Sequence, residues 1–404
     1  METKSLEIAN VITYNIIIDV AGKNGDLKAA TGAFYEVKSL EIANGFTYAN
    51  FIIAAGKNDD LKAATEAFNE AKSLKIADVV TYNSFIDAAG KNGDLKATIK
   101  AFEEAKSLKI ADVITYGSII DASGKNGDLE TATEAFEEAK SLEIADVITY
   151  SSFIDAAGKN GDLKAATQAF KEAKSLKFAN IITYNSFIDA AGKNGDLKAA
   201  TQAFEEAKSL EIADVITYSS FIDAAGKKGD LKTATQAFKE AKSLKITNIV
   251  IYSIFIDAAG KAGNLKMATE AFQEAKAFNI VNNIAYNIYI DILVKRNDIK
   301  NAIKIFKDSG LIFRMYQDNN TKMLDLHNLS HGAGIVVFHL ICKMFNGNVP
   351  TFVCITGKGC HEDHNYLTFR NVLIEYIKQR FPTATCELDQ NNEGRFKVSG
   401  LYRT

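Results

Sequence analysis

Apolar residues recur at helical spacing along the first three-quarters of the chain. In the segment that begins at Ile181, the i, i+3, i+4, i+7 spacing of an amphipathic helix is filled by Tyr184, Phe187, Ile188 and Ala191. Gly195 then suits a left-handed helix end, and Asp196 suits the N-cap of a second helix. The second apolar stripe consists of Leu197, Ala200, Ala203, Phe204 and Ala207. Each such segment is therefore predicted to form a helical hairpin.

The hairpin pattern returns with a fixed period of 34 residues. The period is marked by nine tyrosines: Tyr14, Tyr48, Tyr82, Tyr116, Tyr150, Tyr184, Tyr218, Tyr252 and Tyr286. A period of this size predicts a solenoid, in which each repeat buries its apolar face against its neighbours. The predicted fold is mainly α, a right-handed α-solenoid of about nine hairpins over residues 11–310. Residues 1–10 match the end of a repeat, so upstream repeats and any targeting segment are expected to be missing from this sequence.

The period ends after Gly310, and a different pattern follows. Residues 311–322 are predicted to be a linker. The order predicted next is strand, helix, strand, helix and two closing strands, at residues 322–327, 331–345, 351–357, 367–381, 385–390 and 394–400. Residues 323–404 are therefore predicted to form a small α/β sandwich.

Composition adds little to this architecture. The 404 residues include 47% hydrophobic and 24% charged residues, and the formal net charge is −3. Residues 311–404 hold 10 Lys and Arg against 8 Asp and Glu, which leaves 37 against 42 for residues 1–310. The mildly acidic repeats argue weakly against non-specific, charge-driven binding of nucleic acid. No apolar run has the roughly 18 residues needed to cross a membrane, so no membrane partner is predicted.

The cysteines point to a reducing compartment, because Cys342, Cys354, Cys360 and Cys386 show no C-x-x-C spacing and no disulfide framework. A zinc site formed by Cys354, Cys360, His361 and His364 would match no structural zinc pattern. No metal site is therefore predicted.

Two repeat families use helical hairpins of about this length. The spacing of Ala200, Phe204 and Ala207 fits a tetratricopeptide repeat, but the first helix of that repeat carries Trp, and this chain has none. The phrase V-x-T-Y-N-S-x-I-D, followed by G-K-x-G-D-L, instead resembles the pentatricopeptide repeat closely through nine copies from Val11 to about Gly310. That family usually has one more residue per repeat and a Pro before the final Asp. We therefore expect the turn between repeats, and with it the superhelical pitch, to differ.

The resemblance implies binding of single-stranded RNA at one base per repeat, read by the residue after Tyr and the last residue of the repeat. The pairs are Asn15/Asn44, Ala49/Asp78, Asn83/Asp112, Gly117/Asp146, Ser151/Asn180, Asn185/Asp214, Ser219/Asn248 and Ser253/Asn282, and the ninth repeat offers Asn287. In the family's code these pairs imply the target 5′-Y-?-U-G-A-U-A-A-3′, in which the second pair specifies no base.

Both base-reading positions have a second explanation. Asp and Asn at the repeat end are also among the best N-cap residues for the following helix. The residue after Tyr varies among Asn, Ala, Gly and Ser while its flanks hardly change. A base-reading position would vary in this way, and so would an exposed position without constraint.

Two further positions flank the base-reading residues. Lysine recurs nine residues after each Tyr, where the family places a basic residue near the RNA phosphates: Lys23, Lys57, Lys91, Lys125, Lys159, Lys193, Lys227, Lys261 and Lys295. A lysine at a helix C-terminus also interacts favourably with the helix dipole. The aliphatic residue two positions before Tyr, such as Val80 or Ile114, is implied to clamp adjacent bases. Its alternative role is to pack the start of the helix.

Two short motifs in residues 323–404 resemble the Smr (small MutS-related) domain. They are Leu324-Asp325-Leu326-His327, at the end of the first predicted strand, and Thr356-Gly357-Lys358-Gly359, after the second; His361 and Arg370 also match that family. Asp325, His327 and His361 are thus the candidate catalytic residues. Asp325 would orient His327, or act as a base or metal ligand, with His327 as general acid–base. Thr356, Gly357, Lys358, Gly359 and Arg370 are the candidate phosphate-binding residues.

The Smr resemblance has departures. Asn328 stands where the family usually has Gly, and Glu362-Asp363-His364 replaces a Ser- and Gly-rich stretch. The two added acids would oppose the approach of phosphate, which weakens the case for cleavage more than the case for the fold. The alternative role of Asp325 and His327 is a capped strand end.

The sequence therefore predicts a monomeric pentatricopeptide–Smr protein that binds a short single-stranded RNA in RNA processing. Some Smr domains cleave nucleic acid and others bind only, so the chain is a candidate endoribonuclease, with Mg²⁺ as the one cofactor considered. The alternatives are a non-catalytic RNA-binding adaptor and a tetratricopeptide-like protein–protein scaffold. Location in a mitochondrion or plastid is implied by the resemblance alone.

Overall fold

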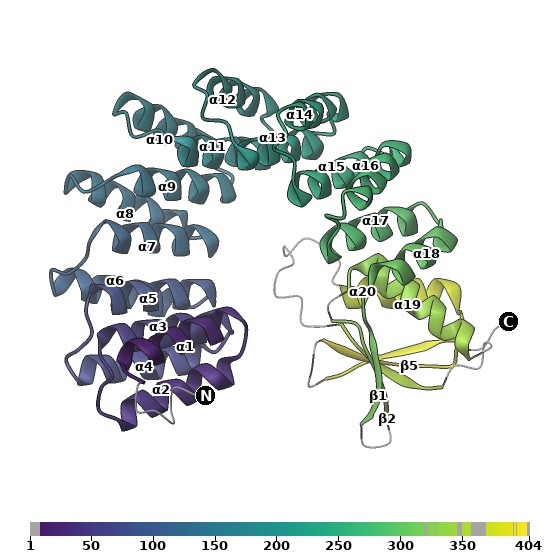
Figure 1. The fold of residues 1–404 in the computed structure, drawn as a ribbon, viewed down its shortest axis with the longest axis horizontal. Coiled ribbons are helices and arrows are strands. Elements are labelled where there is room, and N and C mark those ends of the chain that lie inside the picture. The colour runs from purple at the N-terminus through teal and green to yellow at the C-terminus, as the bar shows by residue number, and fades with distance from the viewer. Residues whose placement is uncertain are drawn as a thin grey trace. The chain divides into compact units, whose positions relative to one another are not determined.

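The computed structural model describes residues 9–318, 321–327, 329–345, 350–356, 369–390, 392 and 394–401. Within them the chain is mainly helical, with a small sheet toward the C-terminus, as the sequence predicts (Figure 1). Contacts divide the chain into two compact units, Met1–Ala224 and Ala225–Thr404. Among the described residues, no helix has the length and apolar character that crossing a bilayer requires.

The predicted helical hairpins are confirmed through residues 11–309. The first helices of the repeats are α1 Val11–Lys23, α3 Gly45–Lys57, α5 Val79–Lys91, α7 Val113–Lys125, α9 Val147–Lys159, α11 Ile181–Lys193, α13 Val215–Lys228, α15 Ile249–Lys261 and α17 Asn283–Lys295. The second helices are α2 Leu27–Ser39, α4 Leu61–Ser73, α6 Leu95–Ser107, α8 Leu129–Ser141, α10 Leu163–Ser175, α12 Leu197–Ser209, α14 Leu231–Ser243, α16 Leu265–Ala277 and α18 Ile299–Ser309.

Helix caps fix the two ends of each hairpin. Gly195 has a φ of 72°, in the left-handed region, and the Asp196 side chain accepts a hydrogen bond from the Ala199 N–H as the N-cap of α12. Between repeats, a capping box starts the next first helix. Asp78 Oδ1 accepts from the Thr81 N–H at 3.0 Å, and Thr81 Oγ1 accepts from the Asp78 N–H at 3.3 Å. These bonds satisfy first-turn N–H groups that would otherwise lack partners.

Successive repeats pack through aromatic rings and alanines. Phe68 of α4 meets Tyr82 of α5 edge-on, with centroids 5.0 Å apart, and stacks on Phe85 at 4.2 Å. All three rings are buried. Buried alanines such as Ala64 and Ala89 let the neighbouring helices approach closely. Each repeat therefore completes its core with side chains of the next repeat.

A row of ion pairs connects the second helices of successive repeats. Lys72 Nζ lies 2.9 Å from Glu104 Oε2, and Lys106 Nζ lies 2.7 Å from Glu138 Oε2. The Tyr82 hydroxyl donates to Glu104 Oε1 at 2.8 Å. Burial raises the pKa of Tyr82, and its bond to Glu104 raises it further, so the hydroxyl stays a donor at physiological pH.

This row predicts that stability falls in acid. Burial opposes the ionisation of Glu104, but Lys72 and the Tyr82 hydroxyl outweigh burial and hold its pKa below 4.5. A carboxylate with a lowered folded-state pKa stabilises the protein above its unfolded-state pKa, and this contribution is lost as the pH falls through the folded-state value. We expect the Tm of Glu104→Gln to lie below the wild-type Tm at neutral pH, and the gap to close once the pH falls well below 4.5. Thermal melts followed by circular dichroism measure this difference in Tm. A difference in acid as large as the one at neutral pH would contradict the prediction.

The C-terminal sheet has the strand order β1-β2-β3-β5-β4, in which β2 and β3 run parallel and the other neighbours run antiparallel. Its strands are β1 Arg314–Asp318, β2 Thr321–Asp325, β3 Phe352–Ile355, β4 Thr385–Leu388 and β5 Arg395–Ser399. Helix α19, His331–Met344, lies between β2 and β3 in the chain, and α20, Phe369–Arg380, lies between β3 and β4. Leu324, Cys354, Phe396 and Val398 are fully buried in the core of this sheet.

Strand β1 corrects the prediction for residues 311–322. That segment was expected to be a linker, but Arg314–Asp318 pairs antiparallel with β2, and Met315 lies opposite Leu324. All five residues of β1 are exposed, so the segment lacks the alternating buried positions by which a strand is recognised in a sequence. Pairing with β2 accounts for this strand.

Candidate nucleic-acid interface

The residue after each tyrosine lies one turn into the first helix of its repeat. The side chains of Asn15, Ala49, Ser151, Ser219 and Ser253 are buried there, as is Gly117, whereas Asn83, Asn185 and Asn287 are partly buried. The Ser151 hydroxyl lies 3.2 Å from Thr183 Oγ1 of the next first helix. These residues therefore lie in the seam between neighbouring first helices. The alternative explanation, that they vary because they are exposed, is wrong.

The residue at the end of a repeat caps the N-terminus of the following helix, which was the second explanation for Asp and Asn at this position. The capping residues in the described repeats include Asn44, Asp78, Asp112, Asp146, Asn180, Asn248 and Asn282, and Asp214 bonds to Thr217 in the same way. Capping does not remove these residues from the candidate interface. It fixes each side chain at the start of the following first helix, beside the residue after Tyr.

Two pairs of candidate base-reading residues touch directly. Asn83 Nδ2 donates to Asp112 Oδ1 at 3.2 Å, and Asn185 Nδ2 donates to Asp214 Oδ1 at 3.4 Å. Thr115 also donates to Asp112 Oδ1 from its N–H and its hydroxyl, so Asp112 Oδ2 takes no part in these bonds. Burial opposes the ionisation of Asp112, but the bonds from Thr115 and Asn83 outweigh it and lower its pKa. Asp112 is thus an ionised acceptor at neutral pH.

Three of the asparagine oxygens at these positions lack partners within the described residues. Oδ1 of Asn15, Asn83 and Asn185 is buried, and no hydrogen-bond donor within the described residues reaches it. Leaving a buried acceptor unsatisfied costs about 1–3 kcal/mol, so such atoms often mark a place for a ligand or water. The pairs Asn83/Asp112 and Asn185/Asp214 each combine such an orphan acceptor with a carboxylate.

Exposed apolar side chains border this seam. The residue two positions before Tyr is exposed in the described repeats, at Ile12, Phe46, Val80, Ile114, Ile148, Ile182, Ile216, Val250 and Ile284. Ile114, for example, is 53% exposed, so it does not pack the start of its helix. A Cβ on Gly117 would lie 3.5 Å from Ile148 Cγ2, which places this apolar row directly beside a base-reading position. Phe46 offers an aromatic ring at the same position, which the sequence prediction did not single out.

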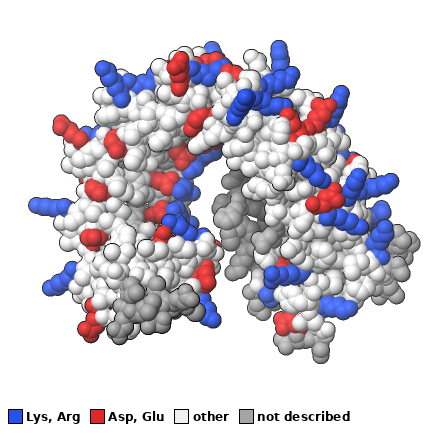
Figure 2. Space-filling model, in the orientation of Figure 1, with Lys and Arg blue, Asp and Glu red and all other residues white. Residues whose placement is uncertain are grey.

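Six of the nine predicted backbone-binding lysines form ion pairs with carboxylates of their own helices. Lys23 lies 2.6 Å from Asp19, and Lys91 lies 2.6 Å from Asp87. The same i,i+4 pair forms between Lys125 and Asp121, Lys159 and Asp155, Lys193 and Asp189, and Lys261 and Asp257. Figure 2 accordingly shows basic and acidic side chains interspersed over the visible face. The repeats hold 37 Lys and Arg against 42 Asp and Glu, so charge alone gives RNA little attraction, and the base-reading seam would have to supply affinity as well as specificity.

The candidate catalytic residues Asp325 and His327 contact each other where β2 ends. Asp325 is the last residue of β2, and its Oδ1 contacts His327 Nδ1 and accepts the His327 N–H at 3.2 Å. The side chain of His327 is 52% exposed and that of Asp325 is 15% exposed. The predicted orientation of His327 by Asp325 therefore has the required geometry. The two residues do not simply alternate along one strand, because His327 lies beyond its end.

Asp325 and His327 line a cavity of about 320 Å³. Its other lining residues are Asn283 of α17, Gly310, Leu311 and Ile312 after α18, Arg314 of β1, and Leu326 and Leu329 after β2. Arg314 is one that the sequence analysis missed, because it lies in the segment expected to be a linker. It pairs in register with Asp325 across β1 and β2.

The other Smr candidates are only partly described. Thr356 is buried, and its N–H donates to the Gly394 carbonyl at 2.9 Å. Gly357, Lys358, Gly359 and His361 lie outside the described residues. Arg370, near the start of α20, is not among the described residues that line the cavity. Of these candidates, the described residues show the contact between Asp325 and His327.

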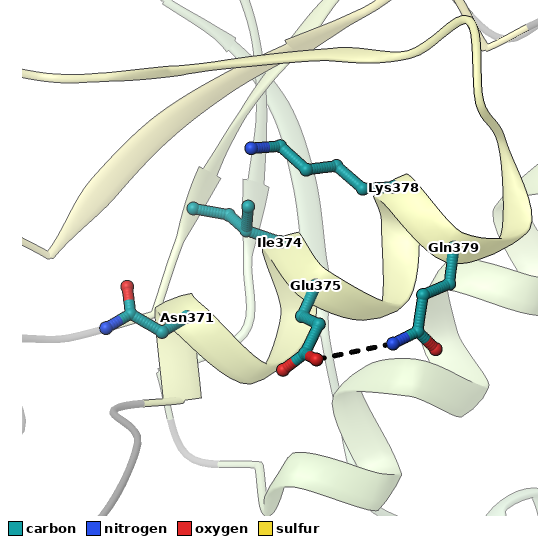
Figure 3. Close-up of a pocket in the computed structure, with 5 residues that line it drawn as sticks. All are labelled: Asn371, Ile374, Glu375, Lys378 and Gln379. Carbon is teal, nitrogen blue, oxygen red and sulfur yellow. Dashed lines mark hydrogen bonds between the residues drawn. The ribbon is translucent and has the colours of Figure 1, made fainter.

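A second depression lies on α20 and has a different character. Asn371, Ile374, Glu375, Lys378 and Gln379 line it, so it is one face of a single helix. Figure 3 shows Glu375 and Gln379 projecting together, with Gln379 Nε2 donating to Glu375 Oε1 at 3.3 Å. Nothing in this face resembles the histidine–carboxylate pair, and we assign it no chemistry.

Within the described residues, no three His, Cys, Asp or Glu side chains gather as a metal site. In the cavity, the one carboxylate among the described lining residues is Asp325, and its Oδ1 is engaged by His327. The described part of the cavity therefore does not by itself form a Mg²⁺ site.

Comparisons with solved structures show the fold. Two structures of the pentatricopeptide repeat protein PPR10 in complex with an 18-nucleotide psaJ RNA element match with a TM-score of 0.54 and 21% identity. Each match covers 76% of this chain and 46% of that one, so the chain spans less than half of PPR10. A further structure, of PPR10 from maize, matches at a TM-score of 0.49 and 19% identity, over 73% of this chain and 43% of that one. A comparison with curated protein sequences gives no match.

Models of protein families match the repeats directly. "Pentatricopeptide repeat-containing protein" matches residues 182–309, "pentatricopeptide repeat domain" matches residues 68–126, 110–160 and 136–194, and "PPR repeat" matches residues 12–42. The matched residues make up more than half of the chain, and they lie in the part of it that forms the helical hairpins. The chain therefore belongs to the pentatricopeptide repeat family.

Proposed function

We propose that the protein binds one short single-stranded RNA in the seam between its first helices, at one base per repeat. The observation that carries the proposal is the direct contact in Asn83/Asp112 and in Asn185/Asp214, each with an orphan amide oxygen beside a carboxylate. A base supplies both donors and acceptors on its edge, which such a pair is able to satisfy. PPR10, which shares the fold, was solved with RNA bound.

The exposed apolar row supports the same proposal. Side chains such as Ile114 and Ile148 stand on either side of a base-reading position, where they would separate and hold successive bases. The paired lysines also offer positive charge to RNA phosphates, although each lysine already contacts a carboxylate of its own helix. Binding should consequently depend on salt only moderately. A protein–protein scaffold does not require orphan acceptors at one position of the repeat.

We propose further that residues 323–404 form an Smr domain, that residues 11–310 form the RNA-binding array, and that the sheet of the Smr domain extends upstream to Arg314. Asp325 would hold the His327 imidazole by its Nδ1, leaving Nε2 for proton transfer at a phosphodiester. Tethering to a bound RNA would give this pair a high effective concentration at one site. The protein acts as a monomer in this proposal. Members of the family are typically organellar, and mitochondrial or plastid residence stays a prediction.

The test uses the full chain with labelled RNA that contains 5′-UUUGAUAA-3′ and a 3′ extension, beside an RNA of scrambled sequence. Gel shift measures binding, and denaturing gels with Mg²⁺ or with EDTA measure cleavage. We expect tighter binding of the target than of the scrambled RNA, and cleavage that is lost in Asp325→Ala/His327→Ala. Glu375→Gln, on the exposed face of α20, is the matched control and should behave as wild type.

Each result separates the candidate functions. Target-dependent cleavage that needs Asp325 and His327 would establish a guided endoribonuclease. Specific binding without cleavage would leave an RNA-binding adaptor. Equal binding of both RNAs would overturn the proposed function.

A further inference from the structure

The ninth repeat differs from the others at its base-reading position. Asn287 Oδ1 accepts the Ser330 N–H at 3.4 Å, from the N-cap residue of α19. The equivalent oxygens of Asn83 and Asn185 have no partner within the described residues. The polar atom that would meet a ninth base is thus already engaged by the C-terminal region.

Asp291 holds the same helix end. In six earlier repeats the equivalent Asp pairs with the Lys four residues later, as Asp87 does with Lys91. Asp291 instead accepts the Ser330 hydroxyl at 2.7 Å and the Gly332 N–H at 2.6 Å. A Cβ on Gly332 would lie 2.5 Å from Asp291 Oδ1 and 2.8 Å from its Cα, so only glycine allows this approach. The carboxylate also lies favourably at the positive end of the α19 dipole.

The cavity with the histidine–carboxylate pair begins beside the last complete base-reading pair. Asn282 is the second residue of the eighth pair, and its neighbour Asn283 lines the cavity. The guanidinium of Arg314 and the imidazole of His327 belong to the same lining. Arginine matches the geometry of phosphate oxygens, and an Asp-oriented histidine suits proton transfer near them. The chemistry of this cavity therefore fits a phosphodiester better than a base.

We propose that the eighth pair, Ser253/Asn282, reads the last base, that the ninth repeat reads none, and that the next phosphodiester enters the cavity of Arg314, Asp325 and His327. In this arrangement Asn287 and Asp291 are docking residues for α19, and Arg314 is a phosphate-binding residue. The inference rests on the proposed function, because it takes the array to bind RNA with its 3′ end toward the C-terminal region.

The test measures the Kd of the full chain for 5′-labelled RNAs by fluorescence anisotropy in EDTA. The eight-nucleotide RNA 5′-UUUGAUAA-3′ is compared with RNAs that carry a ninth nucleotide bearing A, C, G, U or no base. The variants are Arg314→Gln, Asn287→Ala and, as the control for loss of one positive charge, Lys378→Gln on α20. Thermal melts check that each variant is folded.

We expect all five longer RNAs to bind about threefold to tenfold more tightly than the eight-nucleotide RNA, because one phosphate contact is added whichever base follows. Arg314→Gln should lose this gain, whereas Asn287→Ala and Lys378→Gln should keep it. A preference for one ninth base that Asn287→Ala removes would overturn the inference, and so would a gain that survives in Arg314→Gln. If the eight-nucleotide RNA binds no better than a scrambled one, the proposed function fails, and the inference fails with it.

Discussion

The double substitution Asn83→Ser/Asp112→Asn is expected to change the third base of the preferred RNA from U to A. Asp112 is held ionised by Thr115 and Asn83, so this pair presents a carboxylate that only accepts hydrogen bonds. An Asn at the same place both donates and accepts, and Ser/Asn is the pair found in the fifth, seventh and eighth repeats. Each well-matched base contact is worth about 1–3 kcal/mol, so we expect a change of about tenfold or more in the affinity ratio. Equilibrium binding to 5′-UUUGAUAA-3′ and 5′-UUAGAUAA-3′ measures it.

The substitution is designed to spare the fold. Asn already caps the first helix in other repeats, at Asn44, Asn180 and Asn248, so Asp112→Asn should keep the cap of α7. Asp94→Asn is the matched control, because Asp94 caps the second helix α6 and has no proposed contact with a base. An unchanged preference for U in the double variant, with the control behaving as wild type, would contradict the assignment of these two positions.

Replacing Gly158 with Ala is expected to destabilise the array strongly. A Cβ on Gly158 would lie 2.3 Å from Ala190 Cβ and 2.7 Å from Ala190 Cα, so the backbones of α9 and α11 would have to separate. Overpacking of this kind typically costs about 1–3 kcal/mol and sometimes more. Because a solenoid is stabilised by nearest-neighbour interfaces, the weakened interface should also split chemical unfolding into two transitions.

Gly32→Ala is the control for this substitution. Gly32 also lies within a helix, α2, but apart from the backbone of that helix no atom of the described residues lies within 4 Å of the Cβ that would be added. Alanine there should leave stability unchanged or raise it by about 0.5–1 kcal/mol, since Gly is unfavourable inside helices. Urea denaturation followed by circular dichroism compares the two variants. Equal stability of both would show that the Gly158 contact is not a constraint on the array.

The repeats were predictable because local and long-range signals agree in them. The 3.6-residue stripe, the Asn-Gly-Asp break and the 34-residue period all require the same hairpin, and the structure has it. The turn between repeats was not predictable in the same way. Lys75 adopts a φ of 57° there, and a left-handed Lys carries no sequence signal of the kind that Gly gives at Gly195.

The candidate sites were predictable only in part. The pairing of Asn83 with Asp112 and of Asp325 with His327 follows from short motifs that resemble known families. The burial of the residue after Tyr could not be derived from its variability, which an exposed residue would share. The engagement of Asn287 by Ser330 depends on how α19 packs on the last repeat, and sequence periodicity contains no information on that contact.

The central claim is that side-chain pairs along the array select one RNA sequence. Selection from a random RNA pool, with the wild type and Asn83→Ser/Asp112→Asn treated side by side and the retained RNAs sequenced, tests it most directly. The account predicts enrichment of U-G-A-U-A-A by the wild type and of A-G-A-U-A-A by the variant, with the other positions unchanged. Enrichment of no motif, or of the same motif by both proteins, would contradict it.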